Sequence, residues 1–449
     1  MAAVTIASGA GLGAFNNSVH SSTHRLHQVG GNHYHLSIST STHLAQVYKS
    51  SDDLATWTAQ DASNAPSSGS GRVTYILDSY EHSGIIYVLH REFFNALAVA
   101  RFDTSTDTWL SGLGTVTSDS LEQSIGLNFQ ILVRSDGDVL VFYPSNTDPD
   151  DLLYARWEGS SWTSDVVVLD RSGTTVSWYN DAVIDSTDRV FMFYITTADG
   201  DLFYRSLSST NVLGTEVAID TSVSASGTLS DSTRAASYRI YDSGGTDRVL
   251  VAVNNSSDDI DAYVVTLEAD SNGANVATEQ ANIHTRTNLG ENIIATFVHD
   301  GASYIFWTDR DDSDILYIED SGSGWGTAST NGTVWQALTG PTFLGYAGPA
   351  TTADGTGVYV TWEENGTVYG DWFIAPVTNV TINGAHAAAS ATAHTGTLVI
   401  DRTVSGSHAT ASAIANSGTL AIDRNVTGSH ASASATAHDG VATTGVTVQ

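Results

Sequence analysis

Hydrophobic runs recur along the chain at a nearly constant spacing, and each recurrence has the same internal order. A short strand-like run leads through a polar turn to a strong Val, Ile or aromatic run, and then through an acidic or Ser/Thr turn to another run. The strong second runs start about 51 to 59 residues apart, at His33, Ile85, Val139, Val190, Val249, Ser303 and Val358. This spacing is typical of a propeller blade or kelch-type unit, and seven such units fill most of the chain.

Within each unit, the alternation of apolar and polar residues predicts four antiparallel strands. In the fourth unit the expected strands are residues 177–185, 189–196, 201–208 and 214–220. Helical periodicity is nearly absent, and only six prolines interrupt the chain. The number and similarity of the repeats favour a propeller over a β-sandwich, so the expected fold class is all-β, a seven-bladed β-propeller followed by a small repetitive β domain.

We expect the propeller to span residues 1–378 and the repetitive β domain to span 379–449. Residues 3–8 resemble the outer strands of later units, and pairing them with the last blade would close the ring and cover two sheet edges. In the tail, three 22-residue repeats start at Gly384, Gly406 and Gly428. Their alanine-rich strands cannot bury enough apolar area to fold alone, so the repeats should stack, dock on the propeller or associate with copies of themselves.

The charge balance excludes some partners. With 49 acidic against 17 basic residues, the formal net charge is −32. Coulomb repulsion disfavours nucleic acid and anionic membranes, so no nucleic acid partner and no membrane insertion are expected. There is no cysteine for a disulfide framework, no run long enough to span a bilayer, and no Sec signal peptide at the N-terminus. A saline environment and simple solubility explain the acidity equally well.

One turn carries a recognisable motif. Residues 50–57, SSDDLATW, have leucine at position 54 where the Asp-box pattern Ser-x-Asp-x-Gly-x-Thr-Trp has glycine. The pattern is matched at Ser50, Asp52, Thr56 and Trp57. Weaker echoes occur at residues 102–109, 156–162 and 319–325, and together they resemble the sialidase-like BNR-repeat β-propellers over roughly the first 375 residues. In that family the motif staples the hairpin between the third and outer strands, so the resemblance implies a structural role.

The tail repeats resemble the Ala/Gly/His-rich repeats at the ends of tailed-phage structural proteins. This resemblance implies a virion-associated structural or adhesion protein, located on a virion or another extracellular-facing assembly. The expected partners of the tail are other virion proteins and further copies of this chain, as a homo-oligomer. No cofactor is expected.

A sialidase-like glycoside hydrolase is the alternative. Such an enzyme would need three arginines that grip a carboxylate, a Tyr–Glu nucleophile pair and an Asp acid/base. Arg72 and Arg234 open inner strands, where side chains can point into the central channel, but the sequence offers no clear third arginine or Tyr–Glu pair. No catalytic residue is therefore assigned, and ion pairing with the abundant carboxylates explains the two arginines as well.

Aromatic side chains favour a surface glycan or host receptor as the ligand of the propeller. Flat rings stack on the C–H faces of a sugar, while Asn, Asp and Arg side chains hold its hydroxyl groups. The candidate ligand-binding residues are Arg72, Tyr143, Trp178, Tyr179, Tyr194, Arg234, Asn292, Trp307 and Trp362. The competing interpretation is burial between blades, which strand alternation predicts for about half of the rings.

Two other clusters have the residue types of metal sites. The acidic turns at 146–151, 197–201, 254–261 and 308–314 could offer oxygen ligands to Ca²⁺, although Asp, Asn and Gly are also ordinary turn residues. Six histidines gather in the first unit, at His20, His24, His27, His33, His35 and His43. Two of them share one strand face like a Zn or Ni pair, but no third ligand can be placed. No metal ligand is assigned, and Ca²⁺ binding by the acidic turns stays open.

Overall fold

The computed structural model describes most of the strands of the chain and the shorter turns between them. The described residues are 3–8, 10–11, 24–39, 44–52, 54–60, 65, 73–92, 96–117, 129–145, 151–163, 165–169, 177–196, 201–220, 236–242, 245–254, 259–267, 277–285, 294–299, 301–308, 314–320, 325, 333–336, 338, 342–348, 358–364, 367–374, 380–383, 386–393, 398–405, 408–427 and 431–448. Within these residues the structure is all-β, and its strands form eight sheets.

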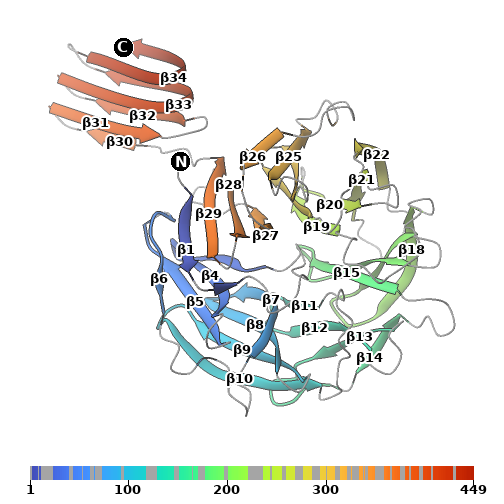
Figure 1. Cartoon of the computed structure of the whole chain (residues 1–449). Helices are drawn as coiled ribbons and strands as arrows, with labels where there is room; N and C mark the ends of the chain where they lie inside the picture. Colours follow the sequence, from blue (N-terminus) through green and yellow to red (C-terminus); the bar gives the residue numbers. More distant parts are fainter. Residues whose placement is uncertain are drawn as a thin grey trace. The chain divides into compact units, whose positions relative to one another are not determined.

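Seven of the sheets are the blades of a β-propeller, so the predicted fold class is confirmed (Figure 1). The strands of each blade are given from the innermost strand outwards. Blade one contains β2 (Ala10–Gly11) with β3 (Leu26–Val29), β4 (Asn32–Ser39), β5 (Ala45–Ser50) and β6 (Thr58–Ala59), and blade two contains β7 (Val73–His82), β8 (Ile85–Glu92), β9 (Leu97–Asp103) and β10 (Thr108–Thr117). Blade three contains β11 (Gln130–Val133), β12 (Val139–Pro144), β13 (Leu152–Arg156) and β14 (Val166–Leu169), and blade four contains β15 (Ser177–Ile184), β16 (Val190–Thr196), β17 (Leu202–Leu207) and β18 (Leu213–Asp220). Blade five contains β19 (Ala236–Asp242), β20 (Asp247–Asn254), β21 (Asp259–Thr266) and β22 (Ala277–Thr285), and blade six contains β23 (Ile294–His299), β24 (Ala302–Thr308), β25 (Ile315–Asp320) and β26 (Thr333–Gln336). Blade seven contains β27 (Thr342–Gly348), β28 (Val358–Glu364), β29 (Thr367–Ile374) and β1 (Val4–Ser8).

The blades are joined along their inner edges. The innermost strands of blades two to seven contact one another in chain order, from β7 through β11, β15, β19 and β23 to β27. In the last sheet, β1 lies beside β29 at the outer edge, as predicted for residues 3–8. A strand from the start of the chain therefore completes the blade built from residues 342–374.

The second strand of each blade is buried on both of its faces. In β16, all five residues from Val190 to Tyr194 are at most 2% exposed. Phe191 and Phe193 pack in one cluster with residues of blade five, whereas Met192 and Tyr194 pack in another with residues of blade three. The two faces of one strand thus bury apolar area against the preceding and the following blade, which explains why these runs are almost continuously hydrophobic.

The eighth sheet contains the 22-residue repeats. Its strands are β30 (Val380–Asn383), β31 (His386–Ala393), β32 (Leu398–Ser405), β33 (His408–Thr427) and β34 (Ala431–Val448). All of its pairings are parallel, and each residue pairs with the residue 22 positions later, as in His386 with His408 and Ala409 with Ala431. The period of the sequence is therefore the register of the sheet, so the repeats stack on one another.

This register requires each repeat to turn back on itself. A straight strand of 20 residues would extend about 66 Å, and the three residues between β33 and β34 could not retrace that length. Each repeat must therefore complete one turn of a coil before the next begins. Residues 370–449 belong to one compact unit together with residues 1–4 and 349–360, and the boundary expected after residue 378 stays a prediction.

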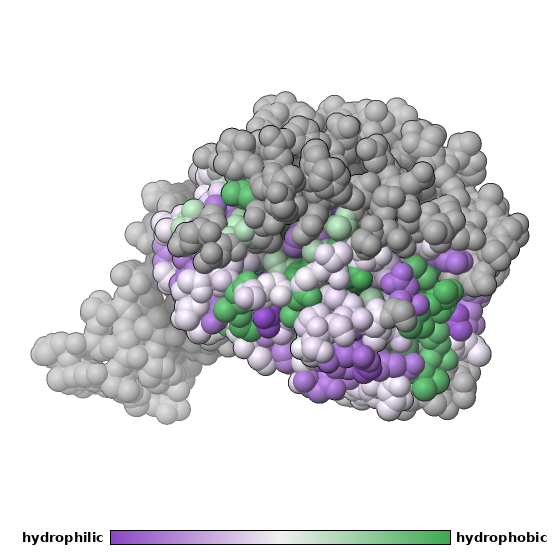
Figure 2. All heavy atoms as spheres, turned by 90° about the horizontal axis from the view of Figure 1, so that it is seen from below, coloured by the Kyte–Doolittle hydropathy of each residue, from purple (hydrophilic) through white to green (hydrophobic). Residues whose placement is uncertain are grey.

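The surface that the structure describes is mixed in character. Seen from below, hydrophobic residues form separate patches among hydrophilic ones (Figure 2). Large exposed hydrophobic side chains on the described surface are Val166, Val167, Val212 and Val334, which lie on outermost strands or beside one. Scattered exposed apolar residues are normal on protein surfaces and indicate no docking site by themselves. In the described part of the chain, no helix has the length and apolar character needed to cross a membrane.

Candidate functional site

Four of the aromatic residues expected at a glycan site are core residues. The side chains of Tyr143, Tyr194, Trp307 and Trp362 are at most 1% exposed. The two tyrosine hydroxyl groups donate hydrogen bonds to carboxylates next to or on the outermost strand of their own blade, Asp165 and Glu216. A ring without an exposed face cannot stack on a sugar, so the interpretation as blade core applies to all four rings.

The remaining expected site residues cannot be placed at the level of side chains. Trp178 and Tyr179 lie on β15, and their side chains are outside the described part of the structure. Arg72, Arg234 and Asn292 also lie outside the described residues. The same holds for most of the acidic turns, at residues 146–150, 197–200, 255–258 and 309–313, and for two of the six histidines, His20 and His43. Their proposed roles stay predictions.

The turn that follows β5 is held by its own polar side chains. The Ser50 hydroxyl donates to Asp52 Oδ1 at 2.9 Å and accepts the Leu54 amide at 3.0 Å, while Asp52 also accepts the amide and hydroxyl of Thr56. These hydrogen bonds hold the pKa of Asp52 below its usual value. Leu54 has a positive φ of 68°, a conformation that glycine adopts at lower cost.

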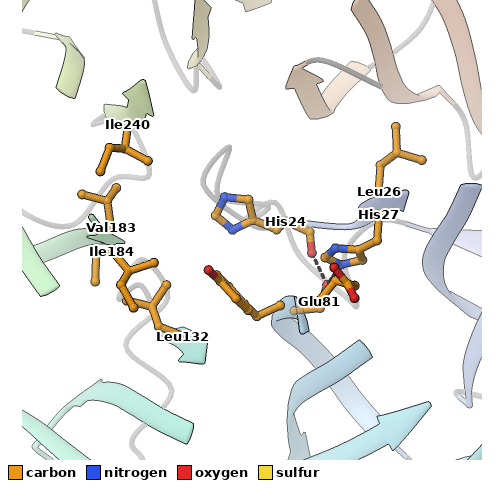
Figure 3. Close-up of a pocket in the computed structure, with 11 residues that line it drawn as sticks. His24, Leu26, His27, Glu81, Leu132, Val183, Ile184 and Ile240 are labelled. Atoms are coloured by element: carbon orange, nitrogen blue, oxygen red, sulfur yellow. Dashed lines mark hydrogen bonds between the residues drawn. The ribbon is translucent and has the colours of Figure 1, made fainter. Parts of the chain in front are cut away.

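A cavity of about 260 Å³ lies among the innermost strands of blades one to five (Figure 3). Its lining residues are His24, Leu26, His27, Ser79, Tyr80, Glu81, Leu132, Ala182, Val183, Ile184 and Ile240. We call this cavity the channel pocket, because innermost strands line the central channel of a propeller. Its volume is just below the range of about 300 to 1,000 Å³ that is usual for drug-sized ligands, so it suits a smaller molecule.

Bulges in two innermost strands precede the residues that line the channel pocket. In β7, Leu77 is an extra residue between Ile76 and Asp78 relative to the partner strand β8. In β15, Asn180 is likewise an extra residue before Asp181. The three residues that follow each aspartate, 79–81 and 182–184, line the pocket. Because a bulge bends a strand and changes the direction of its side chains, these two bulges position the lining residues.

One side of the channel pocket is polar, and we call it the polar wall: His24, His27, Ser79 and Glu81. It is fixed by the fully buried Asp78 on β7, whose Oδ1 accepts the His24 amide at 2.9 Å and lies 3.3 Å from His24 Nδ1. Asp78 Oδ2 accepts the amide of Ile131 on β11 at 3.0 Å. A single buried side chain therefore joins the inner segments of blades one, two and three.

Hydrogen bonding sets the tautomer of His27. The Ser79 hydroxyl donates its one hydrogen to the carbonyl of His24, so it must accept a hydrogen bond from His27 Nε2, which lies 2.7 Å away. Nδ1 of His27 is then the nitrogen with the lone pair. Burial, with a smaller contribution from the charge of His24, lowers the pKa of His27 to about 3. At neutral pH this ring is an uncharged hydrogen-bonding group.

Glu81 of the polar wall and the neighbouring Tyr80 complete this side of the pocket. Glu81 is half-buried, and its Oε1 accepts the Gly84 amide at 2.8 Å, which holds the carboxylate near the turn between β7 and β8. Tyr80 is also half-buried. Burial, followed by the charges of Glu81 and Asp188, raises its pKa, so its hydroxyl stays protonated and can both donate and accept a hydrogen bond.

The opposite side of the channel pocket is aliphatic. We call it the apolar wall: Leu132, Ala182, Val183, Ile184 and Ile240. Figure 3 shows Leu132, Val183, Ile184 and Ile240 facing the group formed by His24, Leu26, His27 and Glu81 across the cavity. Ile184 and Ile240 are partly exposed, whereas the other three side chains are buried. The pocket therefore offers hydrogen bonds on one side and apolar contact on the other.

The described residues do not form a metal site. No group of three or more His, Cys, Asp or Glu side chains in this part of the chain could hold an ion. His33 and His35, which share one face of β4, are 1% and 0% exposed. Burial is the main cause that lowers the pKa of His35 to about 3, so this ring is neutral in the folded protein.

The histidines were predictable from the sequence, but the pocket was not. The cluster in the first unit includes His24 and His27, which line it, yet their partners come from innermost strands as far along the chain as Ile240. The available signal is an aspartate followed by three lining residues, LDSYE at 77–81 and NDAVI at 180–184. Each motif begins at the bulge residue of its innermost strand, Leu77 in β7 and Asn180 in β15.

Comparison with solved structures gives the fold. The chain resembles an ulvan lyase, a polysaccharide lyase, with a TM-score of 0.54, 11% identity, and coverage of 83% of this chain and 96% of that one. The same lyase bound to -[GlcA(1-4)Rha3S]- gives a TM-score of 0.55 with equal identity and coverage. A lectin from Burkholderia pseudomallei covers 80% of this chain and 99% of its own, with 12% identity and a TM-score of 0.48. Neither the protein-family models nor the curated sequences give a match.

Proposed function

We propose that this propeller is a carbohydrate-binding module and that the channel pocket holds one sugar unit of its ligand. The observation that carries the proposal is the two-sided lining of the pocket. Sugars have hydroxyl groups that exchange hydrogen bonds and C–H faces that prefer apolar contact, and the polar and apolar walls offer both. The similarity in fold to an ulvan lyase, whose structure holds the saccharide -[GlcA(1-4)Rha3S]-, supports carbohydrate binding in general and not that particular sugar.

A glycan array probed with the full chain tests this proposal. The expected result is binding to at least one glycan class, and competition by the free saccharide that corresponds to it. His27→Ala is expected to weaken the interaction about tenfold, because the ring offers hydrogen bonds inside the pocket. A flat array would overturn the proposal. Cleavage of bound glycosides, lost in Arg72→Ala and Arg234→Ala, would instead favour the sialidase-like hydrolase.

We also propose that the turn at residues 50–57 is an Asp-box and that the propeller belongs with the BNR-repeat β-propellers. The hydrogen bonds from Ser50, Leu54 and Thr56 within this turn support the proposal, as does the positive φ of Leu54 at the glycine position of the pattern. Asp52→Ala is expected to lower the free energy of unfolding by about 1 kcal/mol through loss of these bonds, measured by urea denaturation. An unchanged free energy would remove the stapling role.

For the tail, we propose attachment to a virion or another extracellular-facing assembly, and self-association of the chain. The support is the resemblance of the 22-residue repeats to phage structural proteins together with their stacked parallel register. Light scattering of the full chain should give a mass of several copies. Mass spectrometry of density-purified particles from the source culture should detect the chain. A monomer that is absent from such particles would contradict this role.

A further inference from the structure

The charge of the channel pocket restricts which sugar it can accept. Among the described lining residues there is no Arg or Lys, and the one carboxylic acid is Glu81. Arg25 is adjacent in sequence, but it does not line the pocket, and its Nη2 donates to the Ile76 carbonyl at 2.7 Å. An anionic ligand would therefore meet a carboxylate without a neighbouring permanent cation in the described lining.

The two histidines of the polar wall do not supply a free positive charge. His27 is bound to Ser79 through Nε2 and is neutral near pH 7. The ring of His24 lies 3.3 Å from the buried Asp78, so any charge on it is already matched by that side chain. His24 and His27 can therefore act as hydrogen-bonding partners for the hydroxyl groups of a sugar.

The surroundings of Tyr80 also disfavour an anionic ligand. This residue lies between Ser79 and Glu81 in the lining, and the negative charges of Glu81 and Asp188 add to burial in raising its pKa. Asp188 itself accepts the amide and hydroxyl of Ser135 in the turn of the neighbouring blade, so this carboxylate is fixed in place. A second negative charge brought into the pocket would be repelled by the Glu81 carboxylate, whereas the charge of Asp188 is offset by the nearby Arg134.

We infer that the channel pocket selects an uncharged sugar and discriminates against sugars that carry a carboxylate or sulfate. This inference rests on the proposed function, because it specifies the ligand of the same site. Its basis is the juxtaposition of Glu81, the neutral His27 and the apolar wall, without a cation among the described lining residues. Burying an anion beside the Glu81 carboxylate costs free energy, whereas the hydroxyl groups of a neutral sugar can exchange hydrogen bonds with Glu81 and His27.

Matched pairs of saccharides test the inference. The probes are the methyl glycosides of glucose, galactose and mannose, together with the methyl glycosides of glucuronic, galacturonic and mannuronic acid, which carry a carboxylate at C6 in place of the CH2OH group. With the full chain, titration calorimetry should show that each neutral glycoside that binds does so at least about tenfold more tightly than its uronate. Glu81→Gln keeps an oxygen for the Gly84 amide and should reduce this ratio to about threefold or less.

The control is Glu319→Gln, which removes one carboxylate from an exposed position of β25 in blade six and should leave the ratio unchanged. Uronates that bind as tightly as or more tightly than the neutral glycosides to the unsubstituted chain would overturn the inference and leave carbohydrate binding intact. An equal change of the ratio in both variants would also overturn it, because the effect would then be one of net charge. If neither set binds and the glycan array is flat, the proposed function itself fails.

Discussion

The polar and apolar walls of the channel pocket differ in how the fold holds them. On the polar wall, position is set by a few directed bonds, from His24 and Ile131 to Asp78 and from His27 to Ser79. On the apolar wall, position is set by packing, since Ala182 belongs to the cluster shared by blades three and four and Val183 to the cluster shared by blades four and five. Directed bonds fix which groups a ligand meets, while packing fixes the space it can fill.

This difference predicts different consequences for substitution. Truncating a residue of the polar wall, or its buried partner, removes a hydrogen-bond partner from a named atom. A residue of the apolar wall can be changed in size with a graded effect, because apolar burial scales with area. Changes to the polar wall should therefore alter ligand selectivity or stability, and changes to the apolar wall should alter affinity for all ligands alike.

The largest expected effect follows removal of the buried acid behind the polar wall. Asp78→Ala leaves the amides of His24 and Ile131 without their acceptor inside the protein, so the free energy of unfolding should fall by about 3 kcal/mol. Asp78→Asn keeps one acceptor oxygen and should lose less. Urea denaturation measures both, with the exposed Glu319→Ala expected to stay within about 0.5 kcal/mol of the unsubstituted chain. A loss below about 1 kcal/mol for Asp78→Ala would show that packing alone holds the polar wall.

The buried histidines predict a loss of stability in acid. The pKa values of His27 and His35 are about 3 in the folded chain and 6.5 for the free side chain, so between these values the unfolded state binds more protons. The contribution of these neutral rings to the free energy of unfolding is complete above pH 6.5. Between pH 6.5 and about pH 3 it is lost as the pH falls, by about 1.4 kcal/mol per pH unit for each ring. Urea denaturation from pH 7 to pH 4 should show a shallower slope for His35→Phe. An unchanged slope would mean that His35 does not couple folding to pH.

The smallest expected effect comes from shortening the apolar wall. Ile184→Ala and Ile240→Ala alter partly exposed side chains, so each should weaken saccharide binding about fivefold while leaving the ratio between neutral and acidic sugars unchanged. Val212→Ala, at a side chain 65% exposed, should leave binding unchanged. A change in the neutral-to-acidic ratio in either isoleucine variant would break the distinction between the two walls.

The periodicity of the sequence was sufficient to predict the blades. The strands expected in the fourth unit at 177–185 and 189–196 correspond to β15 (Ser177–Ile184) and β16 (Val190–Thr196). In the tail, the 22-residue period is the register of the parallel pairs. The strand positions follow from the order of neighbouring residues, and the register follows from the length of the repeat. A single sequence contains both kinds of information.

The channel pocket depends on information that periodicity does not contain. Tyr194 and Trp307 end strong apolar runs and were expected to have faces available to a sugar, but both faces of a second strand are covered by adjacent blades. Alternation gives the side of the sheet on which a residue lies, not whether that side is covered. The lining residues come from five innermost strands between His24 and Ile240, and the two bulges that position them shift the alternation itself.

Filling the channel pocket is the most direct test of whether the sugar binds there. Ile240→Trp replaces a partly exposed member of the apolar wall with a larger side chain, and Val212→Trp adds the same ring at an exposed position outside the pocket. Titration calorimetry with the saccharide that binds best should show binding lost in Ile240→Trp and retained in Val212→Trp, with both variants unfolding at the urea concentration of the unsubstituted chain. Unchanged affinity in Ile240→Trp would contradict the account, because the sugar would then bind outside the channel.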